Sequence, residues 1–174
     1  RCYKINSKSI IIMHNHFNII CWVDYKKKKW SYLESEFIFM KKIVVIGAGY
    51  VGLVSSAGLS EFGHCVTCVD IDKDKINQLN DGEIPIYEPG LDSLIKANLK
   101  KKRLYFSLDI EKEIKDSDII FIAVGTPSKK NGEVDLSYVE SVSKVISKNI
   151  NNYKVICTKS TVPVGTGKMI EKIL

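Results

Sequence analysis

Three glycines stand at fixed intervals in the stretch GAGYVG (residues 47–52), directly after the apolar run KIVVI. In a turn from a strand to a helix, Gly47 permits the tight bend and Gly49 lets a ligand approach the backbone, because neither has a side chain. Gly52 allows the helix to pack closely on the sheet. The free N–H groups and the dipole at the start of that helix attract an anion such as a pyrophosphate. The spacing therefore predicts a dinucleotide-binding loop, the alternative being a tightly packed glycine turn without a ligand.

An acidic residue, Asp70, ends the next apolar run, CVTCVD. It lies close to the position, about 20 residues after the loop, where a carboxylate accepts hydrogen bonds from the adenosine ribose. A carboxylate there also repels a 2′-phosphate, so the sequence favours NAD over NADP. Lys73 and Lys75 lie nearby and soften this preference. Asp72 stands just before a helical run and is expected to cap that helix.

Two later turns complete the predicted site. The run DIIFIAVG exits into Gly125, Thr126 and a proline, and the run KVICTKS exits through Ser160 and Thr161 into a second proline. In a doubly wound sheet, ligands lie outside the carboxyl ends of the strands where the strand order reverses. Both turns should therefore border the cofactor. The alternative is that the Thr and Ser hydroxyls only satisfy nearby backbone groups.

Short apolar runs alternate with helical segments from Met40 onward, which predicts an α/β domain with a Rossmann-like, doubly wound parallel sheet. The expected strands lie in KIVVIG, CVTCVD, RLYFS, DIIFIAVG and KVICTKS. The expected helices are Tyr50–Phe62, Lys73–Asn80, Leu91–Leu99, Ile110–Lys115 and Leu136–Asn149, and a further helix begins near the end of the sequence. The fifth of these helices has one apolar face, formed by Leu136, Val139, Val142, Val145 and Ile146.

Charge and composition limit the function classes. The 174 residues carry a net charge of +6, with 45% hydrophobic and 26% charged residues, which are ordinary values for a globular domain. Residues 1–39 hold 7 of the 26 Lys and Arg residues but only 3 of the 20 Asp and Glu residues. The positive charge is thus concentrated in this N-terminal stretch, which argues against a nucleic-acid surface on the domain. No apolar run reaches the roughly 20 residues of a membrane span.

Five cysteines are scattered along the chain, and Cys65 and Cys68 have the CxxC spacing seen in zinc and redox sites. They lie in an expected strand, where residues three apart point to opposite faces. We therefore expect buried cysteines, no metal site and reduced thiols in a cytoplasmic protein. Cys157 is likewise expected to be a core residue.

Residues 1–39 differ from the rest of the sequence. They begin with Arg1, and their apolar stretch is broken by His14, Asn15, His16 and Asn18. We expect a leader that is disordered or is translated upstream sequence, with Met40 as the true start of a NAD-binding domain over residues 40–174.

Four motifs in register carry a resemblance to a known family. MKKIVVIGAGYVGLVSSAGLSEFGHCVTCVDID, PIYEPGL, AVGTP and KSTVPVGT occur in this order. The sequence resembles the N-terminal, NAD-binding domain of the UDP-glucose/GDP-mannose dehydrogenases. The resemblance implies an enzyme that oxidises the C6 alcohol of a nucleotide sugar, UDP-glucose above all, to a carboxylate with two NAD⁺ per turnover. It gives Glu88 of PIYEPGL no residue-level role.

The resemblance also implies roles for single residues. Asp70 would hold the adenosine ribose, Lys75 would lie near the adenine, and Thr126 would touch the cofactor. Thr161 would stand beside the reacting centre and position a water. The full set of cofactor-binding residues expected from motif and resemblance is Gly47, Gly49, Tyr50, Val51, Gly52, Asp70, Lys75, Gly125, Thr126 and Thr161.

The family's nucleophilic cysteine and catalytic lysine belong to later motifs than those present here. We therefore expect this polypeptide to bind NAD without turning over substrate, and we expect homo-oligomers only of a full-length chain. Two other interpretations stay open at this point. One is a stand-alone NAD-binding regulatory module, and the other is the cofactor domain of a β-hydroxyacid dehydrogenase.

Overall fold

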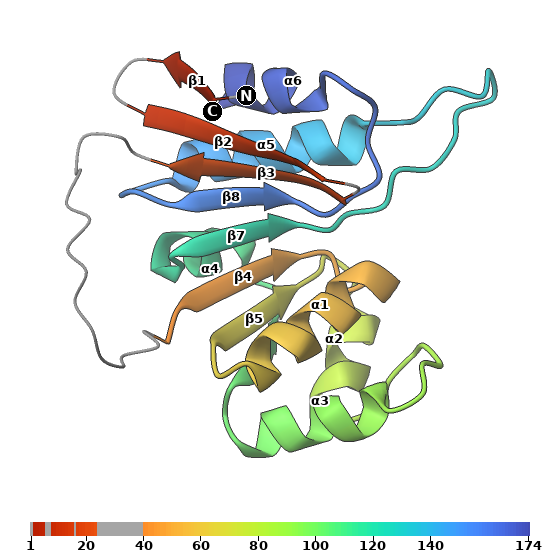
Figure 1. The fold of residues 1–174 in the computed structure, drawn as a ribbon. Coiled ribbons are helices and arrows are strands. Elements are labelled where there is room, and N and C mark those ends of the chain that lie inside the picture. The colour runs from red at the N-terminus through yellow and green to blue at the C-terminus, as the bar shows by residue number, and fades with distance from the viewer. Residues whose placement is uncertain (1, 6–7, 16, 24–39) are drawn as a thin grey trace.

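The computed structural model describes residues 2–5, 8–15, 17–23 and 40–174. The first three of these ranges hold strands β1 (Cys2–Ile5), β2 (Lys8–Asn15) and β3 (Phe17–Val23), which pair as an antiparallel sheet in the order β1-β2-β3. Figure 1 shows β3 beside β8, the last strand of the main sheet. The expectation that residues 1–39 lie outside the functional domain stays a prediction.

Five parallel strands form the main sheet, in the order β6-β5-β4-β7-β8 (Figure 1). They are β4 (Lys42–Ile46), β5 (Cys65–Val69), β6 (Leu104–Ser107), β7 (Ile119–Ile122) and β8 (Val155–Thr158). Within this sheet, β4 comes first along the chain, β5 and β6 follow on one side of it, and β7 and β8 are then added on the other side. The strand order therefore reverses between β4 and β7, as in a doubly wound Rossmann sheet.

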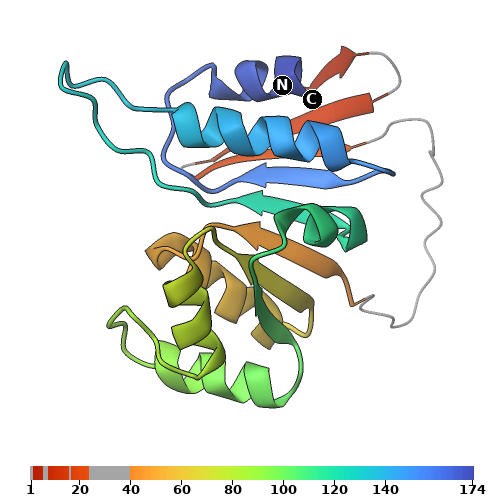
Figure 2. The same ribbon diagram turned by 180° about the vertical axis from the view of Figure 1, so that it is seen from behind.

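In the described residues, six helices are found, and they cover the two faces of this sheet (Figures 1 and 2). They are α1 (Tyr50–Glu61), α2 (Lys73–Asn80), α3 (Leu91–Lys100), α4 (Ile110–Asp116), α5 (Ser137–Asn149) and α6 (Thr166–Ile173). Asp72 and Asp109 cap α2 and α4 by accepting hydrogen bonds from the amides of Lys75 and Lys112. A side-chain acceptor at this position satisfies a donor that has no partner within the helix.

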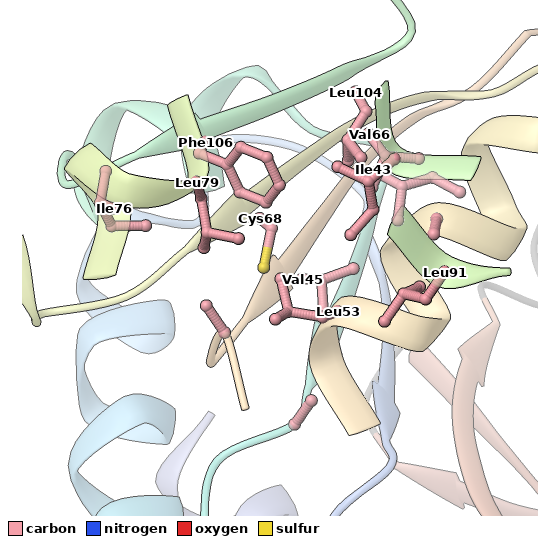
Figure 3. Packing of buried hydrophobic residues seen from close by; sticks show 14 residues of the cluster. Ile43, Val45, Leu53, Val66, Cys68, Ile76, Leu79, Leu91, Leu104 and Phe106 are labelled. Carbon is pink, nitrogen blue, oxygen red and sulfur yellow. The ribbon is translucent and has the colours of Figure 1, made fainter. Parts of the chain in front are cut away.

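The strands divide their side chains between two apolar cores, because successive residues of a strand point to opposite faces. Ile43 and Val45 of β4 face a core built with α1, α2 and α3, which Figure 3 shows from close by. Val44 and Ile46 face a second core built with α4, α5 and α6. Both faces of the sheet are buried, which explains why the strands read as continuous apolar runs.

The predicted fold class is confirmed, and the elements match with small shifts at their ends. Helix α2 has the expected bounds, whereas α1 ends one residue earlier than expected, at Glu61, and α3 and α4 each end one residue later. The strands β7 and β8 are shorter than the apolar runs that predicted them, because the chain leaves the sheet before Ala123 and Lys159. The segments after these strands form the turns at the carboxyl edge.

Candidate functional site

The glycine-rich loop connects β4 to α1 at the carboxyl edge of the sheet. Gly47 has a φ angle of +109°, and a Cβ atom there would lie 2.6 Å from the carbonyl oxygen of Ala123 after β7. A Cβ at Gly52 would collide with the carbonyl oxygen of Gly47. A Cβ at Gly49 would meet no protein atom within 4 Å. Gly47 and Gly52 are thus required by the fold, and Gly49 leaves open space above the loop.

The start of α1 presents unpaired donors to this space. The first hydrogen bond within the helix runs from the Leu53 amide to the Gly49 carbonyl oxygen at 2.9 Å. The N–H groups of Tyr50, Val51 and Gly52 precede it and therefore have no acceptor in the preceding turn of the helix. Such donors, together with the helix dipole, favour an anion at this point.

Asp70 follows β5 and is bonded to the loop. Its Oδ2 accepts a hydrogen bond from the Ala48 amide at 2.7 Å, and its Oδ1 accepts one from the Asp72 amide at 3.0 Å. The ammonium of Lys75 lies 3.4 Å from Oδ2. Burial by itself would raise the pKa of the Asp70 carboxyl, but the two amide donors and Lys75 outweigh it and hold the pKa below its usual range. Asp70 is therefore ionised at neutral pH.

A cavity of about 590 Å³ lies at the switch point between β4 and β7. Its lining includes Gly47, Gly49, Asp70, Lys75 and Gly125, all of which the sequence singles out. This volume is within the range of cofactor sites. One cavity thus brings together the glycine-rich loop, the acidic residue after β5 and the turn after β7.

The cavity also has an apolar wall that sequence reasoning missed. This wall is formed by Ile71, Leu108, Ile110, Val142 and Val145. Ile71 is 90% exposed although it is a large aliphatic residue. The strand order could have located Leu108 and Ile110, because they follow β6, whose carboxyl end lies beside that of β5. An apolar wall next to the Asp70 carboxylate suits the flat face of an adenine ring.

The turns after β7 and β8 lie against each other. The hydroxyl of Thr126 donates to the carbonyl oxygen of Thr161 at 2.9 Å. The hydroxyl of Ser160 donates to the carbonyl oxygen of Val124 at 2.7 Å. Within the described part of the chain, the cavity lining reaches Gly125 but not Thr126 or Thr161. In this structure Thr126 and Ser160 therefore satisfy backbone groups, and the cofactor roles of Thr126 and Thr161 stay predictions.

The cysteines of the CxxC spacing are both in β5. Cys68 is buried, its thiol lies 3.8 Å from the Gly47 carbonyl oxygen, and burial raises its pKa to about 12. Figure 3 shows its sulfur among aliphatic side chains of the first core. A thiol with this pKa stays protonated at neutral pH, which makes it a poor nucleophile or metal ligand. Cys157 of β8 is buried too.

The residues present suit a dinucleotide. The open space above Gly49 and the three donor groups of α1 fit a pyrophosphate, and the Asp70 carboxylate and the apolar wall fit an adenosine.

None of the helices in the described residues combines the length and the apolar composition needed to cross a bilayer.

Fold and cavity together define a dinucleotide-binding α/β domain. The model of the NAD binding domain of the UDP-glucose/GDP-mannose dehydrogenase family matches residues 41–174, so the chain belongs to this family and NAD is the cofactor of this domain.

Curated relatives agree with this assignment. The chain is 56% identical over 135 residues to the UDP-glucose 6-dehydrogenase TuaD of Bacillus subtilis (strain 168), covering 78% of this chain and 29% of that protein. It is 52% identical over 134 residues to a UDP-glucose 6-dehydrogenase of Rhizobium meliloti (strain 1021), covering 76% of this chain and 31% of that protein. The chain thus spans about three tenths of the length of these relatives.

Solved structures show the same fold. A ternary complex of GDP-mannose dehydrogenase from Pseudomonas aeruginosa matches with a TM-score of 0.71 and 40% identity, over 76% of this chain and 32% of that one. A UDP-glucose dehydrogenase from the archaeon Pyrobaculum islandicum matches with a TM-score of 0.75 and 33% identity, over 80% of this chain and 34% of that one.

Proposed function

We propose that residues 40–174 are the NAD-binding part of a UDP-glucose 6-dehydrogenase. Such an enzyme converts UDP-glucose, two NAD⁺ and water to UDP-glucuronate, two NADH and protons. The observation that carries the cofactor part of the proposal is the single cavity in which Gly49 and Asp70 face the same space. The choice of UDP-glucose among nucleotide sugars is supported by the names of the two relatives at 56% and 52% identity.

In this proposal NAD supplies the hydride acceptor, and the residues of the chain bind and orient it. The amides of Tyr50, Val51 and Gly52 face the pyrophosphate, and Gly47 and Gly52 hold the turn that exposes them. Asp70 accepts hydrogen bonds from the adenosine ribose and disfavours a 2′-phosphate by its charge. Lys75 is held beside Asp70 by their ion pair and lies at the adenine side.

The turns after β7 and β8 serve the nicotinamide side. Gly125 borders the cavity, and the hydroxyl of Thr126 donates a hydrogen bond to the backbone of Thr161, which joins the two turns. We assign Thr161 to the reacting centre, where its hydroxyl positions a water. This assignment rests on the family resemblance of KSTVPVGT and on the closeness of the two turns.

We further propose that the 174-residue polypeptide binds NAD but does not oxidise UDP-glucose by itself, and that it belongs in the cytoplasm. The family's nucleophilic cysteine lies in a later motif, and the buried Cys68 and Cys157 cannot replace it, since neither lines the cavity. A homo-oligomer and a substrate domain belong to the full-length enzyme.

Isothermal titration calorimetry of the purified chain with NAD tests the cofactor role, with NADP as the matched ligand. We expect binding of NAD and at least about tenfold weaker binding of NADP, because the 2′-phosphate would face Asp70. Equal affinities, or none for NAD, would contradict the proposal. The absorbance of NADH in a mixture of chain, NAD and UDP-glucose tests the second part, and any sustained production of NADH would refute it.

A further inference from the structure

Residues 83–88 lead from α2 to the turn before α3, and their side chains alternate between half-buried and exposed. Ile84, Ile86 and Glu88 are the half-buried ones. Ile84 and Ile86 pack against the core beneath α1 and α3. Each of Ile84 and Glu88 precedes a proline, whose ring disfavours the helical conformation for that residue and favours an extended one. The sequence therefore turns Glu88 toward the domain, as it does the two isoleucines.

A tight turn fixes the backbone of Glu88. The amide of Leu91 donates to the Glu88 carbonyl oxygen at 3.0 Å, and Gly90 between them has a φ angle of +84°. Proline followed by a glycine of positive φ is the pattern of a type II turn, whose third position favours glycine because of its positive φ angle. The stretch EPGL thus holds Glu88 at the first position of a rigid turn.

The side chain of Glu88 meets the start of the glycine-rich helix. The phenol of Tyr50, the first residue of α1, donates to Glu88 Oε2 at 2.8 Å. This hydrogen bond raises the pKa of the Tyr50 phenol, because the bonded carboxylate favours the protonated form. Tyr50 is 54% exposed, so burial does not fix its ring. Its own amide is one of the three free donors at the start of α1.

We infer that Glu88 is a positioning residue for the cofactor. By holding the Tyr50 side chain it keeps the first turn of α1 in one arrangement, so that the free amides of this turn meet the phosphates of the dinucleotide without prior ordering. Without that hydrogen bond the Tyr50 ring rotates freely and the helix start frays, and NAD must order both on binding, which costs affinity. This inference rests on the proposed binding of NAD in the cavity above Gly49.

The inference assigns a role to the turn EPGL that is distinct from packing. Within the described residues, neither Glu88 nor Tyr50 lines the cavity. The proposed effect of Glu88 on NAD therefore passes through the backbone of the first turn of α1, which Tyr50 begins. If the turn had only a structural role, it would make the loop more stable without changing the affinity for NAD. The affinity of the variants for NAD therefore distinguishes a positioning role from a structural one.

Four variants of the 174-residue chain test the link: Glu88→Ala, Glu88→Gln, Tyr50→Phe and the double variant Glu88→Ala/Tyr50→Phe. The control is Tyr105→Phe, because the phenol of Tyr105 on β6 is also exposed and donates to the Lys102 carbonyl oxygen at 2.8 Å. Calorimetry measures the dissociation constant for NAD. Hydrogen exchange in the protein without NAD measures the protection of the amides at residues 53–56, which begin with the Leu53 amide bonded to the Gly49 carbonyl oxygen and donate to the first turn of α1.

We expect Glu88→Ala and Tyr50→Phe each to raise the dissociation constant about fivefold, and the double variant to raise it no further, as for one shared hydrogen bond. Glu88→Gln keeps an acceptor and should stay within about twofold of the wild type. The control should behave as the wild type. Exchange at residues 53–56 should be faster in Glu88→Ala and Tyr50→Phe.

The inference is overturned if the single variants bind NAD as the wild type does, if their effects add, or if Glu88→Gln binds as weakly as Glu88→Ala. Unchanged exchange at residues 53–56 also overturns it, whatever the affinities. If the wild type itself binds no NAD, the proposed function fails, and the exchange measurement alone then decides whether Glu88 orders the start of α1.

Discussion

The carboxylate of Asp70 accepts a hydrogen bond from the backbone amide of Ala48, with 2.7 Å between oxygen and nitrogen. Ala48 lies between the first two glycines of the loop, so the acid at the end of β5 is tied directly to the turn after β4. Asp70 therefore helps to fix the loop. In the proposed function it also offers acceptors to the adenosine ribose, and the loop that it fixes receives the pyrophosphate.

Replacing Asp70 by alanine should therefore lower both the affinity for NAD and the stability of the protein without NAD. We expect a dissociation constant at least about tenfold higher, and a free energy of unfolding about 1 kcal/mol lower, as for lost hydrogen bonds. Calorimetry and urea unfolding measure the two effects. The control is Asp92→Ala, which removes an exposed carboxylate paired with Lys96 on α3. A variant with normal stability but weak NAD binding would show that Asp70 binds the ribose but does not stabilise the loop.

Acid should destabilise the wild type more than an Asp70→Asn variant. The pKa of Asp70 is lower in the folded protein than the value of about 3.9 expected for the unfolded chain. The unfolded state then binds more protons than the folded one between these two values. The contribution of Asp70 is complete above about pH 4 and is lost as the pH falls through the folded pKa.

Urea unfolding at pH 6 and pH 3 measures this difference for both proteins. Glu61 and Asp135 also have lowered pKa values and act equally in both, so only the difference between the proteins reports on Asp70. Equal losses of stability in both proteins would show that the pKa of Asp70 is not lowered by folding.

Two glycine substitutions should distinguish residues needed for NAD binding from residues needed for stability. Gly49→Ala places a methyl group in open space, so we expect near-normal stability and a dissociation constant for NAD raised about tenfold or more, because the methyl occupies the approach of the pyrophosphate. Gly52→Ala drives a methyl into the Gly47 carbonyl oxygen and should destabilise the protein by more than about 1 kcal/mol. Thermal unfolding and calorimetry of both variants check the pair. Normal NAD binding by Gly49→Ala would place the pyrophosphate elsewhere.

The ammonium of Lys154 should be important for stability although it lies far from the cavity. It is buried and donates to the carbonyl oxygens of Lys115 and Ser117 at 2.9 and 2.6 Å, where α4 ends. Lys154→Ala leaves both acceptors without this donor and should lower the free energy of unfolding by about 1–3 kcal/mol. The exposed Lys144 of α5 gives the matched control, Lys144→Ala, with an expected change below about 0.5 kcal/mol. Similar losses in the two variants would contradict this role.

Thiol labelling should distinguish the two cysteines of β5. Burial raises the pKa of Cys68 to about 12, whereas Cys65 is partly accessible. Iodoacetamide at pH 8, followed by peptide mapping, should modify Cys65 much faster than Cys68, because the thiolate is the reactive form. Unfolding in urea should remove the difference. Rapid modification of Cys68 in the folded chain would indicate an open or reactive site beside the loop.

Much of this structure follows from patterns that are local in sequence. The loop GAGYVG and Asp70 predict the place of the cavity because a strand, a turn and a helix follow one another directly, and Asp72 could be recognised as a cap in the same way. The apolar wall with Leu108 could not be found without the strand order. The bond between Tyr50 and Glu88 joins residues 38 positions apart, and no periodicity connects them. Likewise, the Thr126 hydroxyl is directed at the Thr161 carbonyl oxygen only because β7 and β8 are neighbours.

The position of NAD on the domain is the central claim, and amide chemical shifts in a ¹⁵N-labelled chain titrated with NAD test it most directly. The account predicts the largest changes in amide shift at residues 47–52, at 70–72 and at Gly125. The amide of Asp70 should show the largest difference in shift between NAD and NADP. Shifts confined to another surface, such as the groove between α1 and α3 around Gly58 and Ala97, would contradict it.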